Sequence, residues 1–324
     1  MPINPENERH AAQIAAGITG RKRGHDFEKI LAAKINLLQH STLPLNISDH
    51  LFVGSPEIWL LSFIFQRSNL EPPFDIKAFS TGGHATGEGG DAVLLESGGL
   101  LRRAKSDLLI QITKAGVKVF YGVSVKTCSK PTPTNAQLYC STADAFCNLL
   151  VSLGIEVSNA ARVALKRFCG DVGFRPTDMN ISDTTKRVNP ERWFWEELPN
   201  DAQLEWADLL TTHQREITHL LLSKGYKDDP FPPSFVLHQT RRFESWEKAE
   251  VAIFTVDELV EFSCRAGGFS TTPYFVRKGR FQDAGVVHQA PRFGFVQFQR
   301  LGNKQNATQL QFNLQAGYFY RLET

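Results

Sequence analysis

Residues 105–127 read KSDLLIQITKAGVKVFYGVSVKT, and this stretch guides the interpretation of the whole chain. Two runs rich in β-branched and other apolar residues, 107–112 and 117–126, are separated by Thr113-Lys114-Ala115-Gly116. Two such runs joined by a short connection that contains glycine are typical of a β-hairpin. The stretch therefore predicts two antiparallel strands.

The register of this hairpin decides which side chains meet. Because successive side chains of a strand point to opposite faces, Ser124 and Lys126 share one face. If Ala115-Gly116 forms a two-residue turn, Asp107 lies directly opposite Ser124. A four-residue loop would place Asp107 opposite Gly122, on the same face. In either register a carboxylate, a hydroxyl and an ammonium group meet at the open end of the hairpin.

These three groups suit the hydrolysis of a phosphodiester. A carboxylate beside a lysine can hold a divalent cation and position a water next to it. The lysine can stabilise the charge that develops on phosphorus or help to deprotonate the water. The alternative is an ion pair at the end of a strand, the commoner fate of an isolated aspartate and lysine.

The composition is that of an ordinary globular protein. Of the 324 residues, 42% are hydrophobic and 22% are charged, which excludes a disordered chain, a collagen and a coiled coil. The formal net charge of +2 identifies no polyanionic partner. The five cysteines are odd in number and lack C-x-x-C spacing, so they predict reduced thiols. His213 and His219 lack the i, i+4 spacing of a helical metal pair.

Neither a membrane nor export is indicated. The longest apolar runs, around 59–65 and 220–222, fall far short of the roughly 20 residues that a membrane span needs. The N-terminal MPINPENERH lacks the apolar core of a signal peptide. We therefore expect a cytoplasmic protein without a membrane partner.

Three parts are expected along the chain. Residues 1–25 are polar, contain the basic stretch Gly20–Gly24, and are expected to form an N-terminal arm. Residues 26–228 are expected to form an α/β core with helical additions. The proline-rich stretch Asp228–Pro233 marks the boundary to a β-rich C-terminal part, 229–324.

Hydrophobic periodicity predicts the individual elements. Asp26 is the expected N-cap of the first helix, and the glycine-rich residues 81–99 are expected to form an irregular, functional or flexible loop. The expected helices span 26–38, 56–65, 135–153, 158–168, 191–224 and 257–265. The further expected strands span 249–255, 274–281, 293–300 and 309–319.

Residues 105–127 resemble the core of the PD-(D/E)XK nuclease superfamily, best known from type II restriction endonucleases. Its motif has an aspartate at the start of one strand and an acidic-x-Lys on the next, here Asp107 and Ser124-Val125-Lys126. The resemblance covers about residues 26–153 in the order helix, strand, strand, strand, helix. It implies a mixed central sheet flanked by helices, with Asp107 binding Mg²⁺ and Lys126 stabilising charge or tuning the water.

The sequence departs from this pattern twice. Ser106 replaces a proline that mainly shapes the chain, and Ser124 replaces the second acid. Some restriction enzymes of the superfamily also have Ser-x-Lys and supply the acid from another element. The candidates here are Glu28, Asp91, Glu88 and Asp144.

Glu28 is the first choice among these acids. It borders the apolar stripe of its expected helix and could point to the sheet edge, or it could simply be a first-turn acid favoured by the helix dipole. Gln137 could hydrogen-bond the attacked phosphate or water, or merely begin a helix.

Basic and amide side chains supply candidate DNA contacts. Arginine pairs with guanine and Asn or Gln with adenine, and lysine and arginine contact phosphates. A solvated sheet face explains the same residues. The candidates are Arg102, Arg103, Lys105 and Lys130 near the motif, and Arg277, Lys278, Arg280, Arg292, Arg300, Lys304 and Arg321 with Gln297, Gln299, Asn303, Gln305, Asn306 and Gln311 in the C-terminal part.

The resemblance implies a magnesium-dependent type II restriction endonuclease that cleaves duplex DNA at a short specific site. A palindromic site that needs two strand cuts would favour a homodimer. Two alternatives remain: a repair or recombination nuclease that reads DNA structure, and a noncatalytic DNA-binding protein that kept a nuclease fold.

Overall fold

The computed structural model divides into two compact units that interleave along the chain. It describes residues 5, 8–38, 43–44, 46–70, 75–86, 89–95, 97–179, 189–224, 229–276, 283–300 and 308–321. Unit 1 comprises Met1–Ala136, Leu222–Leu259 and Ala316–Thr324, and unit 2 comprises Gln137–Leu221 and Val260–Gln315. The expected boundary after residue 228 falls inside the segment Leu222–Leu259 of unit 1, because the chain enters and leaves each unit more than once.

Unit 1 contains a mixed six-stranded sheet with the order β1-β7-β6-β4-β3-β2. Strands β4 and β6 are parallel, and the other neighbours are antiparallel. The strands are β1 (Leu51–Val53), β2 (Asp75–Ser80), β3 (Leu108–Lys114), β4 (Val117–Lys126), β6 (Pro233–Gln239) and β7 (Glu250–Thr255). The helices are α1 (Glu8–Leu37), α2 (Pro56–Arg67), α3 (Gly82–Thr86), η5 (Trp246–Lys248) and η7 (Tyr318–Arg321).

The hairpin of β3 and β4 has the expected two-residue turn. Lys114 pairs with Val117 and Leu108 pairs with Val123. Ala115 and Gly116 have φ values of 50° and 81°, the left-handed conformations that a type I′ turn requires. The four-residue alternative is therefore wrong, and Asp107 immediately precedes β3.

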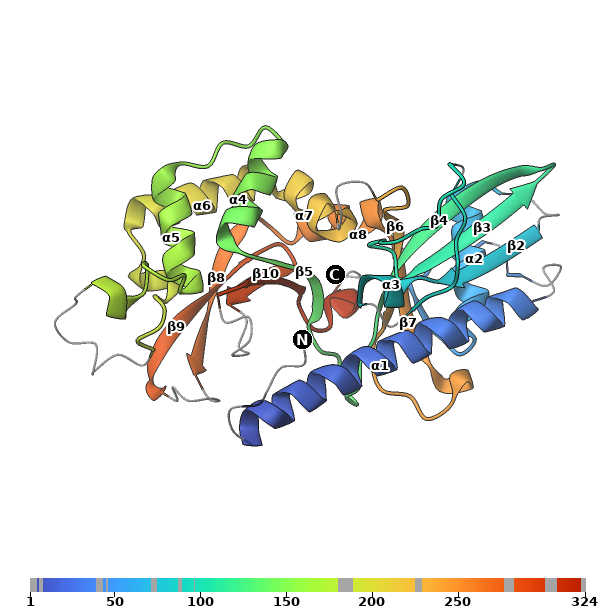
Figure 1. Cartoon of the computed structure of the whole chain (residues 1–324), viewed down its shortest axis with the longest axis horizontal. Helices are drawn as coiled ribbons and strands as arrows, with labels where there is room; N and C mark the ends of the chain where they lie inside the picture. Colours follow the sequence, from blue (N-terminus) through green and yellow to red (C-terminus); the bar gives the residue numbers. More distant parts are fainter. Residues whose placement is uncertain are drawn as a thin grey trace. The chain divides into compact units, whose positions relative to one another are not determined.

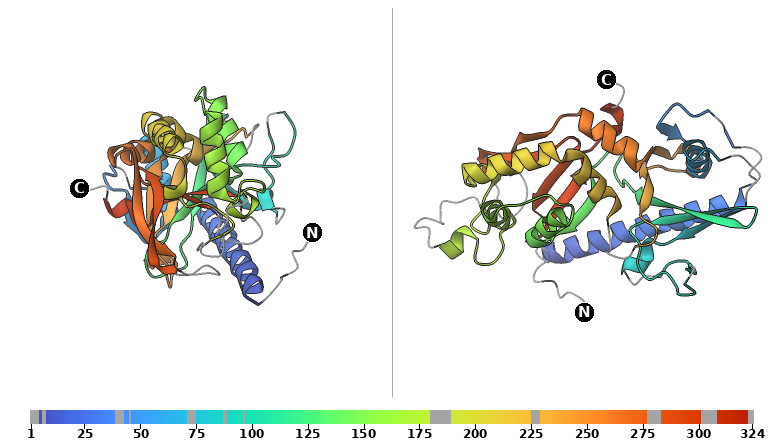
Figure 2. Two further views of the ribbon diagram at one scale, coloured as in Figure 1. Left: turned by 90° about the vertical axis from the view of Figure 1, so that its left-hand side faces the viewer. Right: turned by 90° about the horizontal axis from the view of Figure 1, so that it is seen from above.

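The core of unit 1 forms where α1 and α2 pack on the sheet. Helix α1 contacts β2 and α2 (Figures 1 and 2). The buried side chains of this core include Phe27, Leu31 and Ile35 of α1, Leu60, Phe63 and Ile64 of α2, and Ile110, Leu237 and Ile253 of the strands. Their burial is the main force that holds the helices to the sheet.

Helix α1 corrects two expectations. It runs without interruption from Glu8 to Leu37, so from Glu8 on the residues expected to form a separate N-terminal arm, Gly20–Gly24 included, belong to this helix. Asp26 lies inside the helix and is not an N-cap. Residues 26–37 are held by packing, and extending an existing helix costs far less than nucleating one. The alanine, glutamine and basic residues before them are good helix formers.

Unit 2 contains a separate five-stranded sheet with the order β5-β11-β10-β9-β8. Strands β8, β9, β10 and β11 form successive antiparallel pairs. The strands are β5 (Ala136–Ser141), β8 (Phe269–Val276), β9 (Asp283–Phe293), β10 (Val296–Arg300) and β11 (Leu310–Leu314). The helices are α4 (Ala143–Ser152), α5 (Asn159–Cys169), η2 (Pro176–Met179), η4 (Trp195–Glu197), α6 (Asn200–Thr212) and α7 (Gln214–Ser223), with α8 (Val256–Arg265) at the boundary to unit 1.

Several expected elements have different boundaries. The expected helix 135–153 is strand β5 followed by α4, whose N-cap Thr142 accepts a hydrogen bond from Ala145 N. The expected helix 191–224 is divided into η4, α6 and α7. The expected irregular loop 81–99 contains the short helix α3. Strands β1, β2 and β6 were not predicted. Strand β1 has only three residues and β6 is buried almost throughout, so neither shows the alternation that marks a half-buried strand.

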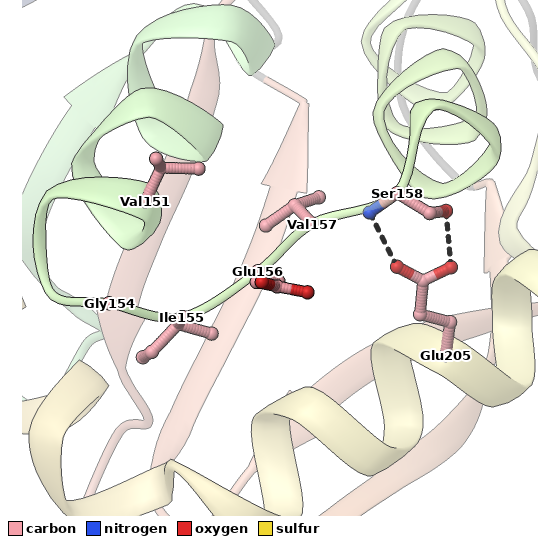
Figure 3. A pocket seen from close by; sticks show the side chains of 7 residues that line it. All are labelled: Val151, Gly154, Ile155, Glu156, Val157, Ser158 and Glu205. Atoms are coloured by element: carbon pink, nitrogen blue, oxygen red, sulfur yellow. Dashed lines mark hydrogen bonds between the residues drawn. The ribbon is translucent and has the colours of Figure 1, made fainter.

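A cavity of about 590 Å³ in unit 2 lies beside the start of α5 (Figure 3). The Glu205 carboxylate of α6 accepts hydrogen bonds from Ser158 N at 2.8 Å and Ser158 Oγ at 2.5 Å. Ser158 is the N-cap of α5. The carboxylate therefore braces one helix against another.

Among the described helices, none has the length and apolar character to cross a membrane.

Candidate active site

Asp107 is fixed by the backbone around the end of the hairpin. Its N–H donates to Val123 O at 2.9 Å, and its carbonyl accepts from Thr81 N at 2.9 Å and Gly82 N at 3.1 Å. Its Oδ2 atom accepts a further hydrogen bond from Val125 N at 2.7 Å. The main-chain contacts hold the backbone of Asp107 in place, and the hydrogen bond from Val125 N orients its carboxylate.

Ser124 and Lys126 of β4 both contact this carboxylate. Ser124 Oγ donates to Asp107 Oδ2 at 3.2 Å. Lys126 Nζ lies 3.8 Å from the same oxygen, and the Lys126 and Asp107 side chains are 19% and 24% exposed. The predicted meeting of carboxylate, hydroxyl and ammonium is therefore observed, in a partly shielded position.

Glu28 brings a second carboxylate to this site from α1. It is only 5% exposed, and its Oε2 atom has no hydrogen-bond partner among the described residues. Burial, and next the negative charge of Asp107, raise the pKa of Glu28 to about 8, while Lys126 opposes the shift. A buried carboxylate beside a second carboxylate is electrostatically unfavourable unless a proton or a cation is present.

Gly82 of α3 allows the backbone to approach both acids. Its N–H donates to Asp107 O, and a Cβ atom at this position would lie 2.2 Å from Glu28 Oε2. At Gly24 a Cβ would be 3.8 Å from Glu28 Oε1. At Gly82 the glycine-rich sequence thus permits close packing against Glu28.

Lys105 is a further ionisable group in this region. Its N–H donates to Asp229 Oδ2 at 2.6 Å, which ties the start of the motif to the segment before β6. Burial, and next the charge of Lys126, lower the pKa of Lys105 to about 8, against the opposite effects of Asp107 and Asp229. The side chain was expected along a phosphate path, and it is partly buried near the catalytic candidates.

His238 is the residue near the site that the sequence pattern did not reveal. It pairs in register with Lys126 across the parallel strands β4 and β6. It is 1% exposed, with the rings of Tyr318 and Phe319 at 5.9 and 5.2 Å. Burial, and next the charge of Lys126, lower its pKa to about 4. The apolar run 235–237 directly before it was the available signal for β6.

The other candidate acids have structural partners or lie outside the description. Asp144 belongs to unit 2, where it pairs with Lys166 at 2.7 Å and Arg162 at 3.4 Å. The hydrogen bond from Lys166 is the main cause that lowers the pKa of Asp144. Asp91 Oδ2 accepts from Ser80 N at 2.7 Å and secures the end of β2. Glu88 lies outside the described residues. Glu28 is thus the acid that the structure brings to Asp107.

The candidate DNA contacts divide into exposed, buried and undescribed residues. Arg102, Arg103 and Lys130 are exposed in unit 1. The Arg300 side chain, by contrast, is 7% exposed and lies 3.5 Å from Glu191, which argues against a base-reading role for it. Arg277, Lys278, Arg280, Lys304, Asn303, Gln305 and Asn306 lie outside the described residues.

The remaining polar candidates also have specific places. Gln137 lies on β5, where its Oε1 accepts from Gln311 Nε2 at 2.9 Å. Gln311 Oε1 in turn accepts from Gln299 Nε2 at 3.4 Å. Arg292 donates to Gly294 O at 3.2 Å. These amides pair with one another across the sheet, as expected for its polar face.

The two acids are of the ligand type that magnesium takes. Within the described residues there is no group of three or more His, Cys, Asp or Glu side chains that could hold a metal. Mg²⁺ needs fewer protein ligands than such a group offers, because it keeps several waters and is commonly held by one or two carboxylates together with substrate phosphates. Asp107 and Glu28 could supply these carboxylates, and Glu28 Oε2 has no hydrogen-bond partner in the described part of the chain.

Comparisons with known proteins add no family to this description. No protein-family model matches the chain, and no curated protein matches it either. The chemistry of the site has to be inferred from its geometry.

Proposed function

We propose that this protein is a magnesium-dependent endonuclease that hydrolyses phosphodiester bonds in duplex DNA at a short specific sequence, as type II restriction endonucleases do. The proposal rests chiefly on one observation. Glu28 is buried, its Oε2 lacks a hydrogen-bond partner among the described residues, and it lies close enough to Asp107 for that charge to raise its pKa. Glu28 therefore takes the part of the second acid of the superfamily motif, whose position Ser124 occupies in this chain.

Each side chain has a definable role in this proposal. Asp107 and Glu28 hold the magnesium ion, which when bound polarises a phosphate oxygen and acidifies a coordinated water. Lys126 stabilises the negative charge that develops on phosphorus and orients the attacking water. Ser124 donates to Asp107 Oδ2 and keeps that carboxylate in place.

The order of elements agrees in part with the superfamily resemblance. Helix α1 precedes β2, β3 and β4, which are adjacent antiparallel strands of one sheet, but β1 and α2 lie between α1 and β2, and α3 lies between β2 and β3. Strand β5 then comes before the next helix, where the resemblance implied a helix directly. The agreement covers the elements that carry Glu28, Asp107 and Lys126.

The electrostatic link between Glu28 and Asp107 favours an enzyme over a noncatalytic DNA-binding protein. A binding module has no need for two acids whose charges destabilise each other. A structure-specific repair nuclease would share this site, and only the cleavage pattern separates it from a restriction enzyme. A homodimer stays a prediction that follows from a palindromic target.

The test is cleavage of plasmid and phage DNA with and without magnesium. We expect discrete fragments from the wild type, and a loss of at least about 100-fold in Asp107→Ala, Lys126→Ala and Glu28→Gln. Asp144→Asn is the matched control, because Asp144 is paired within unit 2. This variant should retain activity. Intact DNA with retained binding would support the noncatalytic alternative, and unspecific or structure-dependent cutting would support the repair nuclease.

A further inference from the structure

Unit 1 contains a cavity of about 450 Å³ that the catalytic proposal does not use. Its size falls within the roughly 300–1,000 Å³ typical of small-molecule sites. Three segments line it: α1, the residues after β4, and the segment from the end of β6 to the start of η5. We call it the Trp246 pocket. Its residues are Gly20, Arg23, Asp26, Phe27, Ile30, Thr127, Cys128, Ser129, Gln239, Arg242, Phe243 and Trp246.

Three aromatic rings form one wall of the Trp246 pocket. The centroid of Phe27 lies 5.3 Å from that of Trp246 and 6.1 Å from that of Phe243. Phe243 and Trp246 are 6.0 Å apart at 84°. Trp246 Nε1 donates to Glu57 Oε2 at 2.5 Å, so the indole is anchored from behind. Phe27 is buried at the base of the wall, Phe243 and Trp246 are half-buried, and Lys34 Nζ lies 5.4 Å from the centroid of the Trp246 ring.

Positive charge lies at the rim. Arg23 and Arg242 are both exposed, and in the described part of the chain neither guanidinium forms an ion pair. Asp26 on the same rim offers an acceptor for an amino group. This combination of an aromatic wall with two available guanidinium groups suits a flat heterocycle that carries a phosphate.

The two loops that line the pocket are fastened to each other. Gln239 Nε2 donates to Cys128 O at 2.8 Å and to Arg241 O at 2.7 Å. Arg242 N donates to Lys130 O at 2.7 Å. These hydrogen bonds hold the two segments together, so little ordering is needed when a ligand binds.

The pocket adjoins the candidate active site. Thr127 follows Lys126, and Phe27 precedes Glu28. A Cβ atom at Gly24 would lie 3.8 Å from Glu28 Oε1 and 3.9 Å from Thr127 Oγ1, so one turn of α1 borders both places. A nucleotide in the pocket would therefore lie near the phosphate that is cleaved.

We propose that the Trp246 pocket binds a single nucleotide of the DNA, with its base against the aromatic wall and its phosphate at Arg23 and Arg242. A base stacked inside a duplex cannot enter a pocket, so the nucleotide is turned out of the helix. Stacking on aromatic side chains tolerates every base, because each base has a π face. That this nucleotide belongs to a DNA strand rests on the proposed function.

The test titrates the protein with dAMP, without DNA or magnesium, and follows tryptophan fluorescence and ligand-observed NMR. We expect dAMP to bind and to quench Trp246, with deoxyadenosine and inorganic phosphate each binding more weakly. Removing both guanidinium groups in Arg23→Ala/Arg242→Ala should weaken dAMP binding at least about tenfold. Arg21→Ala, a loss of charge at an exposed position of the same helix, should keep the wild-type affinity.

The outcomes separate this pocket from the catalytic proposal. Absent dAMP binding, or equal binding by the double variant and the wild type, would overturn the pocket whatever the cleavage assay shows. Asp107→Ala should lose cleavage and still bind dAMP like the wild type. If the wild type binds dAMP in an arginine-dependent way but cleaves no DNA, the pocket stands and the nuclease proposal fails.

Discussion

Gly82 lies so close to Glu28 that a Cβ atom at residue 82 would be 2.2 Å from Glu28 Oε2. The same glycine donates its N–H to Asp107 O. One backbone position thus sets the places of both acids, and the absence of a side chain is what allows Glu28 to point to the hairpin.

Replacing this glycine should damage the site more than the fold. In Gly82→Ala the new methyl group displaces the Glu28 carboxylate, and a displacement of about 1 Å can cost on the order of 100-fold in rate. We expect magnesium-dependent cleavage to fall between about tenfold and 100-fold, measured as initial rate against magnesium concentration. Gly99→Ala is the control, because among the described residues a Cβ there would meet only Ser97 Oγ, at 3.7 Å. Equal rates in Gly82→Ala and the wild type would refute the role of the close contact.

Glu28 should make the metal-free protein less stable as the pH rises. The pKa of its carboxyl is raised from 4.5 to about 8, so between these values the folded protein holds a proton that the unfolded chain releases. The stabilisation that the protonated Glu28 gives the folded protein is fully present below pH 4.5. It is lost as the pH rises through 8, at up to about 1.4 kcal/mol per pH unit.

Denaturant unfolding in EDTA at several pH values between 5 and 8.5 measures this effect. We expect the stability of Glu28→Gln relative to the wild type to increase with pH, because glutamine does not titrate. Added magnesium should stabilise the wild type most at high pH, where the carboxylate is ionised. A constant difference between the two proteins would contradict the raised pKa.

His238 should make the protein sensitive to acid. Burial and the charge of Lys126 lower the pKa of His238 from 6.5 to about 4. Between these pH values the unfolded chain binds a proton at His238 that the folded protein does not bind. Stability is therefore lost as the pH falls from 6.5 through 4, by up to about 1.4 kcal/mol per pH unit. In His238→Gln this loss should disappear. Thermal unfolding at pH 4.5, 5.5 and 7 compares the two proteins, and parallel pH profiles would rule out a neutral buried imidazole.

The first half of α1 should gain stability from alanine. Gly17 is exposed and helical, and a Cβ atom added there would have no neighbouring atom within 4 Å among the described residues. Gly17→Ala should raise the free energy of unfolding by about 0.5–1 kcal/mol, since glycine loses more backbone entropy in a helix. Gly170→Ala is the opposite case, because Gly170 ends α5 with φ at 75° and a Cβ would meet Glu191 O at 2.3 Å. It should destabilise the protein in the same urea titration.

The hairpin was predictable because its information is local. The two-residue turn, the pairing of Lys114 with Val117 and the proximity of Asp107 to Ser124 follow from strand alternation and turn length. Helices that carry their own caps or apolar stripes, such as α2 and α5, were also close to their expected bounds. The start of α1 was misjudged because helix extension depends on a packed neighbour segment.

By itself, the sequence determined the α/β class, the hairpin and the candidate trio of Asp107, Ser124 and Lys126. Only the tertiary structure decided that Glu28 joins them, that Gly82 makes room for it, and that His238 lies beside Lys126. The reason is physical. A strand or turn is specified by neighbours a few residues away, whereas parallel pairing of β4 with β6 and the packing of α1 on the sheet join segments that are distant along the chain.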